Sequence, residues 1–164
     1  STTLCTSIIK LLDYFCMNYE HSVSKDVEMV ELQVKENDEW TSIYGEMAII
    51  RFLGRCTRTY PNKNAYDASL IDTSLDKLQS FKSNASDTII QELEIYLADG
   101  FKYQCDFNCM TIADICWATY LHGKLYLLNY KNVNEYVQGI YDELQPADNS
   151  AKKSWQAFMN STPE

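Results

Sequence analysis

The chain has 164 residues, of which 46% are apolar, and its formal net charge at pH 7 is −9. That length and apolar fraction suffice for a hydrophobic core, and they exclude collagen-like and disordered chains. No apolar run approaches the roughly 18 residues of a membrane-spanning helix. The negative charge disfavours direct binding of nucleic acid, because neutralising phosphates requires a basic surface. A basic protein partner suits the chain better, and so does a simply solvated acidic surface.

The N-terminal third alternates between helical and extended patterns. Apolar residues at spacings of three and four predict a helix over 3–19, and a period of two over 27–43, broken by a polar turn, predicts a hairpin. Helical spacing returns over 45–56. A linker-like stretch at 55–64 suggests a boundary, so we expect a small α/β unit at 1–57 and a helical unit at 58–164. The face of 45–56 predicted to point inward consists of Ala48, Ile49, Phe52, Leu53 and Cys56.

The second unit reads as a series of helices. One covers 66–82, another runs from an N-cap at Ser86 to Gly100, and two follow residue 130, the last containing Trp155 and Phe158. The helix over 111–121 is the most informative. Thr111 and Asp114 have the spacing of a capping box, and the residues after them are apolar around nearly the whole circumference, which is typical of a helix buried on all sides.

Groups suited to chemistry are sparse. Of the six cysteines, Cys105 and Cys109 are close together, but a zinc site needs two more ligands and His122 is the only other obvious one. We therefore expect no metal site, and we expect reduced thiols in a cytoplasmic protein. His21 and His122 are not convincing bases, and no phosphate-binding glycine loop, HExxH or GxSxG motif occurs. The sequence predicts no catalytic or cofactor-binding residue.

A second apolar stripe on the helix over 45–56 points to a partner. On a helical wheel Met47, Ile50 and Gly54 lie opposite the predicted inward face, where a solvated helix would carry polar residues. Such a stripe suggests contact with another chain, and a glycine at position 54 would let a partner backbone approach closely. The alternative is that the next helix of the same chain covers this face.

Two segments resemble the glutathione transferase superfamily. Thr111-Ile112-Ala113-Asp114-Ile115 is similar to the capping box that opens its central buried helix, and Ala48-Ile49-Ile50-Arg51-Phe52-Leu53 to the run after its last strand. The stretch 113–119 is especially similar to the transferase-like domain of glutamyl-type tRNA synthetases, whose relatives occur in multi-synthetase complexes. The resemblance implies an α+β to mostly α fold, with a truncated thioredoxin-like unit before the helical one. It also implies a dimer interface on the helices over 45–56 and 66–82, with Met47, Ile50, Leu70 and Ser74 as contact residues.

Two requirements of glutathione transferases are not met in this sequence. The resemblance calls for a cis-proline before the third strand, but none of the three prolines, Pro61, Pro146 and Pro163, lies in the predicted hairpin. Gly45-Glu46 replaces the pair that holds the γ-glutamyl end, and a carboxylate there would repel the carboxylate of the substrate. We therefore expect a non-catalytic interaction module without cofactors, which pairs with another transferase-like domain as a homodimer or heterodimer. It would be part of a longer synthetase or an adaptor. The alternative is a divergent transferase that uses glutathione as co-substrate.

Overall fold

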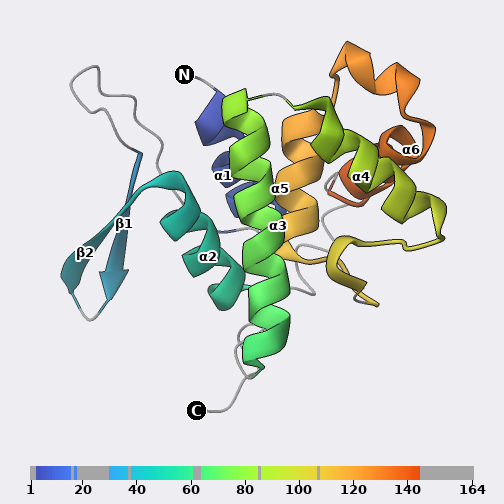
Figure 1. Ribbon diagram of the computed structural model, residues 1–164. Coiled ribbons are helices and arrows are strands. Elements are labelled where there is room, and N and C mark those ends of the chain that lie inside the picture. Colours follow the sequence, from blue (N-terminus) through green and yellow to red (C-terminus); the bar gives the residue numbers. More distant parts are fainter. Residues whose placement is uncertain are drawn as a thin grey trace.

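The computed structural model describes residues 3–15, 17, 30–36, 38–60, 64–84, 86–106 and 108–144. This part of the chain is mostly helical, with one two-stranded antiparallel sheet, which confirms the expected α+β to mostly α class (Figure 1). The elements in chain order are α1 (Thr3–Tyr14), β1 (Glu31–Glu36), β2 (Glu39–Tyr44), α2 (Glu46–Cys56), α3 (Ala65–Asn84), α4 (Asp87–Ala98), the short 3-10 helix η1 (Gln104–Asp106), α5 (Ile112–Leu121), η2 (Leu125–Asn129) and α6 (Lys131–Glu143).

The predicted hairpin is present, and the burial of β1 follows the period of two. Its register pairs Glu31 with Tyr44 at one end and Glu36 with Glu39 at the other. Leu32 is half-buried, whereas its neighbours Glu31 and Gln33 are exposed. A two-stranded ribbon is marginally stable by itself, and this one packs against α2 (Figure 1).

Helix α5 forms the centre of the core. Residues 112–118 are all buried, as the circumferential apolar pattern predicts, and α5 packs against α1, α2, α3 and α6. A single apolar cluster joins side chains of α1 and α2 to those of the later helices. The turn after α2, where the predicted boundary falls, therefore connects two segments that share one core.

Local sequence signals predicted some helix ends and missed others. Helix α1 ends at Tyr14, earlier than predicted, because Met17 donates its backbone N–H to Leu12 O at 2.9 Å in the bond pattern that closes a helix. Gly100 follows α4 with φ 93°, the left-handed conformation expected of it. Ser86 occupies the N-cap position of α4, but its side chain makes no capping hydrogen bond. The helix predicted around Trp155 and Phe158 lies outside the described residues.

Candidate interaction surfaces

The predicted outward stripe on α2 is wrong for two of its three residues. Ile50 is fully buried and Gly54 is buried as well, while Met47 is half-buried. Conversely Ala48 and Cys56, predicted to point inward, are exposed. The helix is thus rotated from the predicted orientation.

The two interface residues predicted on α3 also lie elsewhere than expected. Ser74 is buried and hydrogen-bonded within the chain, so it does not lie on an outer face. Leu70 is half-buried and lines a pocket between α3 and α4. Of the predicted contact residues, only Met47 and Leu70 therefore keep part of their surface accessible.

The joined surface of α2 and α3 carries an ion-pair network. Arg51 donates from Nε to Asp72 Oδ1 at 2.6 Å and from Nη2 to Asp76 Oδ1 at 3.0 Å. The hydroxyl of Tyr60 donates to Asp72 Oδ2 at 2.7 Å. Burial raises the pKa of Asp72, but the hydrogen bonds from Arg51 and Tyr60 outweigh it and leave this pKa below its usual value. The network ties the two helices together and leaves charged groups on their surface.

A second ion pair joins the other ends of these helices. Lys82, in the last turn of α3, lies 2.8 Å from Glu46 in the first turn of α2, and the two side chains are only 13% and 9% exposed. Each charge suits the dipole of its own helix end. The family resemblance expects the γ-glutamyl contact at Glu46. The carboxylate of Glu46 is instead paired with Lys82 of the same chain.

The capping box at the start of α5 is confirmed and belongs to a larger network. Asp114 is fully buried, and its Oδ2 accepts from the amide and the hydroxyl of Thr111, each at 2.8 Å. Its Oδ1 accepts from the amide of Gln104 and the hydroxyl of Tyr136, also at 2.8 Å. Burial raises the pKa of Asp114 against these four donors, which favour the charged form. Sequence reasoning identified the Thr111 half of this network and missed the other half, because Gln104 and Tyr136 come from distant parts of the chain.

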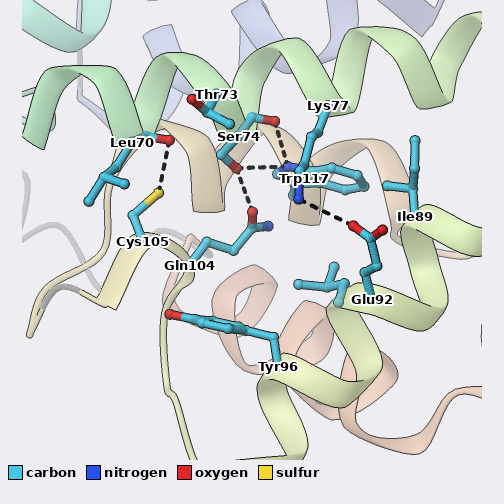
Figure 2. A pocket seen from close by; sticks show the side chains of 11 residues that line it. Leu70, Thr73, Ser74, Lys77, Ile89, Glu92, Tyr96, Gln104, Cys105 and Trp117 are labelled. Atoms are coloured by element: carbon cyan, nitrogen blue, oxygen red, sulfur yellow. Dashed lines mark hydrogen bonds and ion pairs between the residues drawn. The ribbon is translucent and has the colours of Figure 1, made fainter. Parts of the chain in front are cut away.

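A pocket lies between α3 and α4 (Figure 2). It encloses about 330 Å³, at the small end of ligand-sized cavities. Trp117 of α5 forms its floor and donates from Nε1 to the carbonyl and hydroxyl oxygens of Ser74, at 3.2 and 3.1 Å. Ser74 donates in turn to Gln104, whose amide donates to the Tyr136 hydroxyl at 3.3 Å. The floor is thus linked by hydrogen bonds to the network around Asp114.

The thiols of Cys105 and Cys116 are poorly suited to nucleophilic chemistry. Cys105 lines the pocket, and burial, reinforced by the charge of Asp114, raises its pKa to about 12. Burial raises the pKa of Cys116 to about 12 as well. Thiolates are the nucleophilic form, so neither group is activated at neutral pH.

Other predicted chemical groups are not brought together. Cys109 is exposed, and the described residues contain no group of three histidine, cysteine, aspartate or glutamate side chains that could hold a metal ion. His122 ends α5 and stacks on Tyr141, with ring centroids 3.5 Å apart. His21 and the three prolines lie outside the described residues, so the expectation about the cis-proline stays a prediction.

Comparisons with known proteins found no match. No protein-family model, no curated protein and no solved structure matches the chain. In the part of the chain that the structure describes, no helix is both long and apolar enough to cross a bilayer. A functional hypothesis for this chain therefore rests on its own residues and their geometry.

Proposed function

We propose that this chain is a non-catalytic protein-interaction module of the glutathione-transferase-like type, which assembles a tRNA-synthetase or translation-factor complex. Its partner would be a second transferase-like domain, of this chain or of another protein. It would belong to a longer glutamyl-type synthetase or act as an adaptor. The order of elements supports this proposal: helix, hairpin and helix, followed by helices around α5. A truncated thioredoxin-like unit joined to a helical unit would have this order.

The single observation that carries the proposal is the opening of α5. A capping box of Thr111 and Asp114 begins a helix whose residues 112–118 are all buried at the centre of the molecule. This capping box is one of the two segments on which the sequence resemblance depends. It supports the fold of the module more directly than its partner.

The chemistry of the site favours binding over catalysis. Glu46 is engaged by Lys82, and the thiols of Cys105 and Cys116 have pKa values raised to about 12, so none of these groups is prepared to bind or activate glutathione. No observation in the described residues favours the alternative of a glutathione-dependent enzyme.

The corrected orientation of α2 changes which variant tests the partner surface. Ile50 is in the core, so a charge there would unfold the protein; Ala48 is exposed on the same helix and is the better site. We expect wild-type protein to form a dimer, or a complex with a transferase-like domain of a glutamyl- or methionyl-type synthetase, in sedimentation velocity. Ala48→Glu should weaken that complex, since it replaces a methyl group with a larger, charged side chain that a partner packed on α2 would have to desolvate.

The matched control is Asn134→Glu, which adds the same charge to an exposed position of α6. Both variants should keep the helical circular dichroism of the wild type. A wild-type chain that remains monomeric and binds no such domain contradicts the proposal. Equal binding by wild type and Ala48→Glu would move the interface away from α2.

A further inference from the structure

The pocket between α3 and α4 is open because these two helices pack on different neighbours. Helix α3 packs on α5, and α4 packs on α6, so the pair splays apart. One wall carries Leu70, Thr73 and Lys77 of α3, and the other carries Ile89, Glu92 and Tyr96 of α4 (Figure 2). Both rows have spacings of three and four, so each presents one helix face along the groove.

The buried polar atoms of the groove do not need hydrogen bonds from an occupant. Its buried polar atoms are paired with one another: Trp117 with Ser74, Ser74 with Gln104, and the Cys105 thiol with Leu70 O at 3.5 Å. The described residues contain no buried side-chain nitrogen or oxygen without a partner. An occupant would therefore be held by contact with the apolar walls rather than by hydrogen bonds.

An exposed ion pair spans the groove from Lys77 of α3 to Glu92 of α4. Lys77 Nζ lies 3.2 Å from Glu92 Oε2, and both side chains are more than half exposed. Exposed pairs of this kind contribute only about 0–1 kcal/mol. An entering chain can separate them and present a charge of its own to either residue.

Apolar surface continues beyond the groove, which favours a polypeptide over a small molecule. Tyr66 lies one turn before Leu70 on the same face of α3 and is 69% exposed. Ile95 lies three residues after Glu92, next to it on α4, and is 66% exposed. A ligand that fills about 330 Å³ reaches neither side chain, whereas a chain lying along the groove can cover both.

We propose that the groove between α3 and α4 binds an amphipathic, basic helix of a partner protein. A helix fits because its ridges of side chains can enter the space between two splayed helices, with apolar anchors spaced by three and four residues. A basic helix fits because the chain carries a net charge of −9. This surface is separate from that of α2 and α3, because on α3 the residues Thr73 and Asp72 project about 100° apart.

The test is a selection of 16-residue helical peptides, displayed on phage, against the full-length chain. Enriched peptides should carry large apolar residues at helical spacing together with lysine or arginine. Thr73→Trp, which fills the groove from an exposed position, should weaken their binding at least about tenfold, the loss expected when an anchor is displaced. The matched control Gln79→Trp, also exposed on α3 but about 160° around the helix from Lys77 and outside the groove lining, should leave binding unchanged.

Tyr66→Ser provides a second test that does not alter the pocket itself. It should also weaken the peptides, because a helix extends past Leu70. Unchanged binding by Tyr66→Ser together with loss by Thr73→Trp would mean a compact ligand and overturn the helical occupant.

Four further results would overturn the proposal. These are no enrichment, equal binding by Thr73→Trp and wild type, enriched peptides that reproduce the chain's own residues 152–159, and a change in the sedimentation of the protein alone on Thr73→Trp. The third result would mean that the chain itself is the occupant, and the fourth that a second copy is. None of these results depends on Ala48, so failure here is distinguishable from failure of the proposed transferase-like pairing.

Discussion

Replacing Asp114 by alanine should destabilise this protein far more than loss of an ordinary helix cap. The carboxylate accepts hydrogen bonds from two backbone amides, of Thr111 and Gln104, and from the hydroxyls of Thr111 and Tyr136. It is 0% exposed, so water cannot replace it without opening the core. The substitution leaves several buried donors without an acceptor.

The expected magnitude follows from counting those donors. An orphaned buried donor costs about 1–3 kcal/mol, and the two backbone amides cannot rotate toward another acceptor. The sum overstates the effect, because these losses are not additive and because removing the carboxylate also removes the desolvation that raises the pKa of Asp114. We expect a loss of about 3–5 kcal/mol, similar to the breaking of a buried charge network. An isolated cap would cost only about 1 kcal/mol.

Urea denaturation monitored by circular dichroism measures this loss. The dependence of the unfolding free energy on urea concentration should be the same for wild type and variant. Glu94→Ala is the matched control: Glu94 accepts from the amides of Asn132 and Val133 at the start of α6, but it is only partly buried. Water can replace it, so its loss should be about 1 kcal/mol. Asp114→Asn, which keeps one acceptor oxygen, should fall between the two. Equal losses for Asp114→Ala and Glu94→Ala would refute the reasoning.

Two further predictions concern the titrating groups. The folded pKa of Asp72 lies below its usual value, so the Arg51 network stabilises the fold above the unfolded pKa of about 3.9, and that contribution is lost as the pH falls through the lower folded pKa. Asp72→Asn should therefore lower the free energy of unfolding slightly at pH 7, by no more than about 1 kcal/mol because the side chain is 38% exposed, and should have no effect in strong acid. Iodoacetamide at pH 8, with sites mapped by mass spectrometry, should label the exposed Cys109 well before Cys105 and Cys116, whose pKa values are raised to about 12. Early labelling of Cys116 would mean that α5 is not packed as described.

Local sequence signals predicted most of the described helices and the hairpin correctly. The hairpin followed from a period of two, Gly100 from its preference for positive φ, and α5 from its capping box and circumferential apolar residues. Each of these depends on residues within one turn or one strand pair. The end of α1 did not follow in the same way, because apolar spacing continues past Tyr14 although the helix does not.

The sites were harder to predict because they depend on contacts between distant residues. Gln104, Ser74 and Trp117 are more than ten residues apart in sequence, and nothing in their local surroundings indicates that they share one hydrogen-bonded floor. The rotation of α2 shows the same limit. Two arcs of that helix are similarly apolar, and only its tertiary packing, against α1, the hairpin and α5, determines that Ile49, Ile50 and Leu53 face the core.

A substitution of Gly54 can test the orientation of α2, because the predicted and the observed orientations give opposite effects on stability. If Gly54 faced a partner, replacing it by alanine should stabilise the isolated protein by about 0.5–1 kcal/mol, since alanine is the better helix former. In the structure, however, an added Cβ would lie 3.0 Å from the Cβ of Tyr60 and 3.2 Å from that of Ile112. Both neighbours are held in place: Tyr60 is 3% exposed and its hydroxyl donates a hydrogen bond to Asp72, and Ile112 is fully buried.

We therefore expect Gly54→Ala to destabilise the protein by about 1–2 kcal/mol, because overpacking outweighs the gain in helix propensity. Gly139→Ala in α6 is the matched control, since an added Cβ there meets no atom within 4 Å. It should raise stability by about 0.5–1 kcal/mol. Opposite signs in urea denaturation would assign Gly54 to the close approach of α2, the turn after it and the start of α5 within one chain. A stabilising Gly54→Ala that also abolishes self-association would instead return Gly54 to a partner interface.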